Sequence, residues 1–179
     1  MTHFIFRNSW WAIRKRPKIK IGITLFDLII EIAGLVALLT LWIVLMVNYS
    51  GLPDAIPLHF NGAGQVDHFG GKNSIFILPV IATVLFAGMT ILSRFPHVIN
   101  YPVRITEKNA FLQYRNMARM VRCLTLTIIL FFGSLVFHLI LYSGENAEGQ
   151  GLGIWFIPVS LAIIIIPVIY FMVKSFIYR

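Results

Sequence analysis

Charged side chains are scarce in this sequence, and acidic ones are the scarcest. Only 12% of the 179 residues are charged, with 7 acidic residues against 15 basic ones. Globular soluble domains carry about 25% charged residues, so the deficit excludes that class of protein. Hydrophobic residues make up 58% of the chain. This excludes an intrinsically disordered protein as well, because disordered chains are poor in apolar residues.

The sequence has only one cysteine and no recognised catalytic motif. The single cysteine, Cys123, excludes an internal disulfide framework and a cysteine-based zinc site. The sequence shows no internal repeat and no nucleotide-binding, phosphate-binding or nucleophile–base motif. We therefore expect a non-enzymatic protein without a cofactor. An enzyme whose residues converge only in space remains an open alternative.

Long apolar runs are what the sequence does contain. A membrane-spanning helix needs about 20 mostly apolar residues, and four runs meet this requirement, at about 21–48, 75–93, 123–142 and 153–173. The first run is too long for a signal peptide and lacks a small-residue cleavage site. The sequence therefore predicts a single domain over residues 1–179, an all-α integral membrane protein built as a bundle of four transmembrane helices.

The basic residues predict how these spans are oriented. Of the 15 lysines and arginines, all but Lys72 lie near the N-terminus, between the second and third spans, or near the C-terminus. By the positive-inside rule we expect both termini in the cytoplasm and the loop 49–73 on the outer side.

The segment at about 107–122 predicts an amphipathic helix on the cytoplasmic side. Apolar residues recur at helical spacing from Ala110 to Val121, and the other side carries Lys108, Arg115, Arg119 and Arg122. A basic amphipathic helix binds a bilayer that contains anionic lipids. A docking surface for a cytoplasmic partner is the alternative. Nucleic-acid binding is not expected, because no base-reading motif accompanies the charge.

Two acidic residues, Asp27 and Glu31, lie within the first apolar run. Four residues apart, they share one helix face, and carboxylates inside a membrane are costly. In one interpretation they lie near the headgroups and pair with basic residues, for which we consider Lys20, Arg94, Arg122 and Lys174. In the other they serve a small transporter or accessory subunit, or contact a membrane partner or a second copy of the chain.

The outer loop is rich in residues that restrict the backbone. Residues 52–72 read LPDAIPLHFNGAGQVDHFGGK. The prolines favour extended geometry, so residues 58–60 predict a short strand. The Asn61-Gly62 pair and Gly64 favour a turn, and Gly70-Gly71 a second turn before the second span. We expect an ordered loop folded over the outer end of the bundle.

This loop resembles the DUF1648 family of bacterial membrane proteins. The shared pattern, LPxxIPxHFNxxGxxDxxGxK, is carried by Leu52, Pro53, Ile56, Pro57, His59, Phe60, Asn61, Gly64, Asp67, Gly70 (or Gly71) and Lys72. Some members of the family are SdpI-type immunity proteins, which protect a cell from a secreted peptide toxin and signal its presence. The resemblance implies a bacterial cytoplasmic (inner) membrane protein with a role in immunity or sensing.

The outer loop also holds the candidate site. We expect it to recognise an extracytoplasmic peptide or envelope protein through His59, Phe60, Asn61, Asp67 and Lys72. The alternative is a metal-dependent membrane hydrolase or lipid-processing enzyme. No metal-binding motif is present; zinc needs three or four converging ligands, and the first candidates would be His59, Asp67 and His138.

Overall fold

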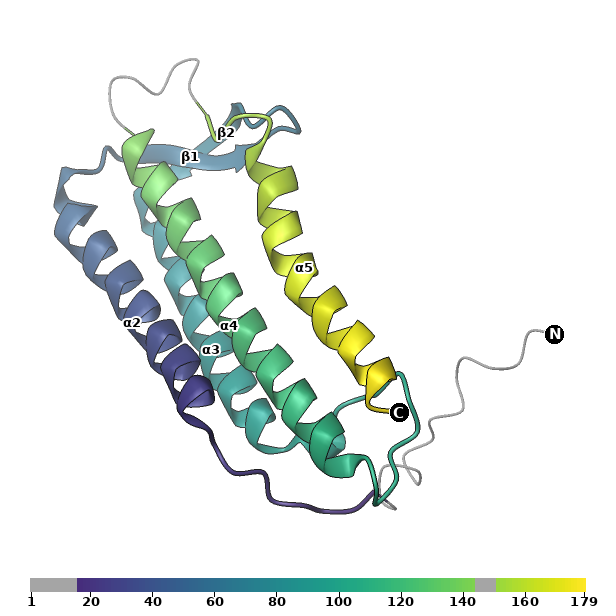
Figure 1. The fold of residues 1–179 in the computed structure, drawn as a ribbon. Coiled ribbons are helices and arrows are strands. Elements are labelled where there is room, and N and C mark those ends of the chain that lie inside the picture. Colours follow the sequence, from purple (N-terminus) through teal and green to yellow (C-terminus); the bar gives the residue numbers. More distant parts are fainter. Residues whose placement is uncertain (1–15, 144–150) are drawn as a thin grey trace.

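The computed structural model describes residues 16–143 and 151–179. Four helices form the bundle: α2 (Leu25–Asn48), α3 (Ile77–Arg94), α4 (Ala110–Leu141) and α5 (Phe156–Ile177). A two-stranded sheet lies across one end of it (Figure 1). Each of the four helices is long and apolar enough to cross a membrane. The predicted set of four spans in a mostly helical membrane protein is therefore confirmed.

Helix α4 is the centre of the bundle, because it packs against each of the other three (Figure 1). The main core lies between α2, α3 and α4, and its buried residues include Leu41, Leu45, Ala82, Ile129 and Val136. The outer faces of the helices are also apolar and expose many large hydrophobic side chains. Helices that are hydrophobic on every side suit a lipid environment.

Helix α2 begins four residues later than the apolar run suggested. The Thr24 hydroxyl accepts the N–H of Asp27 at 3.3 Å, and the Asp27 carboxylate accepts the N–H of Thr24 at 3.0 Å. This is a capping box, in which the N-cap residue must adopt non-helical backbone angles. Residues 21–24 therefore precede the helix, although Ile21 and Ile23 continue the apolar pattern.

The predicted amphipathic helix and the third span are one continuous element. Helix α4 has 32 residues, about 48 Å at 1.5 Å per residue, whereas a bilayer core is about 30 Å thick. The first turns of α4 therefore do not form a separate helix on the membrane surface. Tyr114 and Met117 are buried there in a small core with Tyr101. The 110–132 stretch contains no proline or glycine that would end the helix.

Two buried amides of α4 hold α5 in place. The Gln113 side chain donates to the backbone carbonyl of Ser175 at 2.7 Å and accepts from the Ser175 hydroxyl. One turn further along, the Asn116 amide donates to the carbonyl of Phe171 at 2.8 Å. Small and polar residues commonly join helices inside membranes in this way.

Replacing Gln113 by alanine is expected to weaken the contact between α4 and α5. Ser175 is fully buried and would lose both of its partners on Gln113. We expect the free energy of unfolding in detergent to fall by about 1–2 kcal/mol. Thermal or denaturant unfolding measures this loss. The control is Leu112→Ala, the neighbouring exposed position; equal losses in the two variants would contradict the role of Gln113.

Candidate functional site

A β-hairpin forms most of the outer-loop segment. Strand β1 (Ala55–Phe60) pairs antiparallel with β2 (Val66–Gly71), with Ala55 opposite Gly71 and Pro57 opposite Phe69. The register shifts on either side of His59. Gly70 and Gly71 thus belong to a strand and do not form the expected second turn. A side chain on Gly70 would collide with Leu58, which gives glycine a packing role at that position.

The turn of the hairpin is organised by Asn61. Its side-chain oxygen accepts the N–H of Ala63 at 2.9 Å and that of Gln65 at 3.1 Å. The Asn61 carbonyl accepts the N–H of Gly64 at 2.8 Å. Gly64 has a φ of 78°, a conformation that glycine adopts without strain. The structure therefore places Asn61 in the framework of the loop, with its oxygens used by the backbone.

The hairpin is fixed at both of its ends. At the base, Ile56 is fully buried in the main core, and Lys72 pairs with Asp54 at 3.2 Å. At the tip, the carbonyl of Gly64 accepts the N–H of Leu152 at 2.8 Å, just before α5. The contacts of Ile56 and Gly64 hold the exposed part of the hairpin in one position, and the Lys72 N–H adds a backbone bond to the Asp54 carbonyl at 3.0 Å.

One ionisable pair remains exposed on the hairpin. His59 Nδ1 lies 2.6 Å from Asp67 Oδ1, and the two side chains are 68% and 41% exposed. Leu58, His68 and Phe69 are exposed beside them, whereas Phe60 packs against the main core. Of the five residues predicted to recognise a ligand, the structure thus brings His59 and Asp67 together at the surface.

His138 has other partners. Its Nδ1 donates to the carbonyl of Ser134 at 2.6 Å, and its ring packs against Phe156 with 5.2 Å between centroids. Across residues 16–143 and 151–179, no three histidine, cysteine, aspartate or glutamate side chains converge where they could hold a metal ion. In that part of the chain His59 and Asp67 therefore lack the third ligand that the hydrolase alternative requires.

A second ionic cluster lies at the opposite end of the bundle, between α2 and α4. Asp27 is 1% exposed, and its Oδ1 lies 3.0 Å from Arg119 Nε and 3.7 Å from Arg122 Nη1. Glu31 pairs with Arg94 and, at 3.5 Å, with Arg122 Nε. Since α2 and α4 run in the same direction (Figure 1), two acids four residues apart meet two arginines three residues apart.

This cluster corresponds to the paired interpretation of the two acids. Arg94 and Arg122 are the expected partners, whereas Lys20 and Lys174 form no pair with either acid. Arg119 was not foreseen as a partner, because its spacing had placed it on the basic side of a helix lying on the membrane surface. Arg119 and Arg122 are therefore used inside the bundle. Of the predicted membrane-surface residues, Lys108 stays exposed and Arg115 half-buried.

The hairpin falls within a recognisable family segment. Residues 35–83 match the family model described as a domain of unknown function, DUF1648. Over this segment the chain is similar to the DUF1648 family. The sequence-based resemblance is therefore confirmed. The DUF1648 segment contains most of α2, the whole hairpin and the beginning of α3, and it leaves out Asp27, Glu31 and all of α4.

One curated relative shares part of the chain. An uncharacterized protein of Archaeoglobus fulgidus is 32% identical over 77 residues, which cover 38% of this chain and 42% of the relative. The match thus spans less than half the length of that relative. No solved structure matches the chain. The comparisons thus show a similarity to DUF1648 over residues 35–83 and name no activity.

Proposed function

We propose that this protein is a non-enzymatic, multi-pass protein of the cytoplasmic membrane whose hairpin recognises a peptide or envelope protein on the outer side. The observation that carries this proposal is the exposed His59–Asp67 pair, held on a hairpin whose base and tip are both fixed. A fixed surface binds with a smaller entropic cost than a loop that must become ordered on binding.

The orientation is supported by charge. The end of the bundle opposite the hairpin consists of residues 16–24, 95–109 and the last residues of the chain, and we refer to it as the basic end (Figure 1). Among the basic residues in the described ranges Lys72 is the exception, since it lies at the base of the hairpin. With the basic end in the cytoplasm, the hairpin faces the outer side of the membrane.

The surface chemistry suits an amphipathic ligand. Leu58 and Phe69 are 40% and 46% exposed beside an acid and two histidines. Apolar contacts together with charge-assisted hydrogen bonds fit a cationic, amphipathic peptide, in which basic groups approach Asp67. The resemblance to the DUF1648 family, some members of which are SdpI-type immunity proteins, favours a peptide ligand and a role in toxin immunity or sensing.

The proposal predicts that Asp67→Asn removes protection against such peptides. Cells that produce the native chain are expected to survive higher concentrations of secreted cationic peptides than cells without it. The Asp67→Asn variant should lose most of this protection, because it lacks the charge of the exposed pair. The measurement is the inhibitory peptide concentration, with membrane levels of each variant checked by immunoblot.

The matched control is Asp54→Asn. Asp54 lies at the same end and is 98% exposed, so its replacement removes an equal charge away from the His59–Asp67 pair. The immunity role would be contradicted if cells that produce the native chain were no more resistant to the peptides than cells without it. Equal losses for the two variants would contradict the assignment of the pair as the recognition site.

A further inference from the structure

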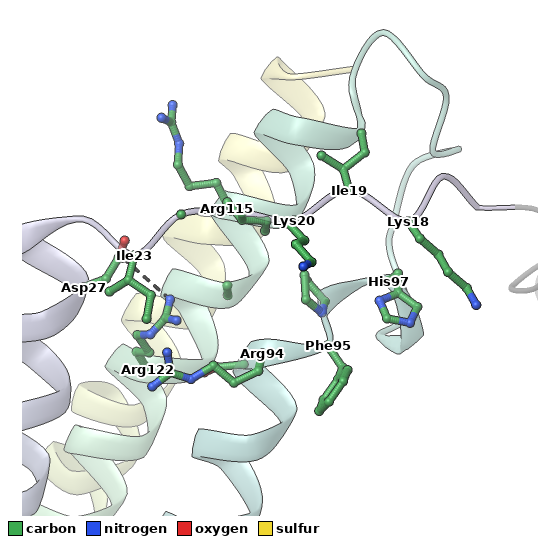
Figure 2. Close-up of a pocket in the computed structure, with 15 residues that line it drawn as sticks. Lys18, Ile19, Lys20, Ile23, Asp27, Arg94, Phe95, His97, Arg115 and Arg122 are labelled. Carbon is green, nitrogen blue, oxygen red and sulfur yellow. Dashed lines mark ion pairs between the residues drawn. The ribbon is translucent and has the colours of Figure 1, made fainter.

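A cavity of about 420 Å³ opens at the basic end, beside the ionic cluster. Its walls come from residues 18–23, the end of α3 with the loop that follows, and one face of α4 (Figure 2). The volume lies within the range of small-molecule sites, about 300–1,000 Å³. The cavity is separate from the hairpin and lies outside the DUF1648 segment.

The lining of this cavity is strongly basic. Five lysines and arginines contribute to it and one acid, Asp27. Figure 2 shows the charged groups of Lys18 and Arg115 pointing away from the others, whereas Arg94 and Arg122 lie side by side and Lys20 extends from the segment that crosses above them. Lys20, Arg94 and Arg122 are thus the three cationic residues of the lining that are not turned away in this view.

The carboxylates present do not balance these cations. Asp27 and Glu31 together face three guanidinium groups, those of Arg94, Arg119 and Arg122. Lys20 forms no ion pair or hydrogen bond within the described ranges 16–143 and 151–179. Residues 1–15 contain no aspartate or glutamate at all, so no acidic side chain of that segment can supply the missing negative charge.

Two buried atoms of the ionic cluster, one donor and one acceptor, lack a hydrogen bond within residues 16–143 and 151–179. Arg122 is 8% exposed, and its Nε makes no hydrogen bond within the part of the chain that is described. The atom that faces it at 3.5 Å, Glu31 Oε2, is likewise buried without a hydrogen bond. A buried charge that lacks part of its hydrogen bonding is costly, so Arg122 is held in the cluster without a full set of partners in the described ranges.

Phosphate is the anion that this arrangement suits best. Arginine side chains present several donors in a planar fork that matches phosphate oxygens, and lysine adds a point charge. Ile23 and Phe95, which also line the cavity, are about half exposed and provide an apolar surface next to the cations. Basic pockets between transmembrane helices on the cytoplasmic side are the places where phospholipid headgroups bind.

We propose that this cavity binds one phosphate group through Lys20, Arg94 and Arg122. The same chemistry is offered by the headgroup of an anionic phospholipid and by free phosphate from the cytoplasm. The two sources differ in whether acyl chains accompany the phosphate, so they can be separated by experiment.

The test uses the full chain, purified in a neutral detergent and freed of lipid. Dioleoyl-phosphatidylglycerol is titrated and the bound lipid counted by native mass spectrometry, with dioleoyl-phosphatidylcholine as the uncharged comparison. In parallel, inorganic phosphate is added and the rise in Tm measured. The variant is Lys20→Gln, which removes a cation without breaking an observed pair. Its control is Lys108→Gln, which removes an equal charge at the same end outside the cavity.

One bound phosphatidylglycerol, with an affinity about fivefold lower in Lys20→Gln and unchanged in Lys108→Gln, would support the site with a lipid as its source. A rise in Tm with inorganic phosphate that is lost in Lys20→Gln, without lipid bound, would support it with a soluble source. If neither probe binds, or if the two variants weaken binding equally, the site is overturned and the charge acts only as a general surface potential.

Discussion

Replacing Asp27 by alanine is expected to cause the largest loss of stability of any single substitution considered for this protein. The change removes the carboxylate that faces Arg119 and Arg122 and also the cap of α2. Removing one partner of a buried pair costs about 3–5 kcal/mol, because the remaining charge is left uncompensated. We expect a much lower free energy of unfolding in detergent and a reduced folded yield.

Two comparisons separate the pair from the cap. Thr24→Ala weakens the cap and retains the carboxylate, so it should cost only about 1 kcal/mol. Asp54→Ala removes an exposed acid and should have little effect, because exposed ion pairs contribute little to stability. If Asp27→Ala proved as stable as Asp54→Ala, the ionic cluster would not hold α2 to α4.

Replacing Gly64 by alanine is expected to release the tip of the hairpin from the segment before α5. A Cβ at this position would lie 2.5 Å from the Gly153 carbonyl oxygen, and the φ of 78° disfavours any L side chain. The left-handed conformation alone costs about 1–2 kcal/mol. We expect faster hydrogen exchange at the Leu152 N–H, which the Gly64 carbonyl accepts in the native chain.

Gly62→Ala provides the matched control, because nothing lies within 4 Å of a Cβ built there. The two variants add the same methyl group to the same turn, two residues apart. Exchange at Leu152 should therefore stay at its native rate in Gly62→Ala. If the Leu152 N–H exchanged at its native rate in Gly64→Ala as well, the contact between the tip and Leu152 would not depend on this glycine.

The sequence predicted the parts of the fold that depend on composition. The four spans follow from long apolar runs, and they are present because the length of a membrane helix is set by the bilayer. The boundaries were less accurate where local chemistry overrides hydropathy. Thr24 starts α2 after the apolar pattern begins, and nothing at the junction of Arg122 and Cys123 ends α4.

The sites were predicted only in part. Resemblance to the family singled out His59 and Asp67, which form the exposed pair. The same pattern included Asn61 and Lys72, which support the hairpin, since spacing alone does not separate a framework residue from a surface one. The sequence grouped Lys20, Arg94 and Arg122 as partners of the two acids, but it did not predict the cavity, because its walls form only when the helices pack.

Helix α5 packs mainly against one other helix, and yet it is held near both of its ends. Leu152, just before its start, bonds to the hairpin tip, and Ser175 near its other end bonds to Gln113 of α4. A partner that lifts the tip must therefore break the Leu152 bond or pull α5 along with it. In the second case the movement of α5 also strains the bonds between Ser175 and Gln113 at its other end.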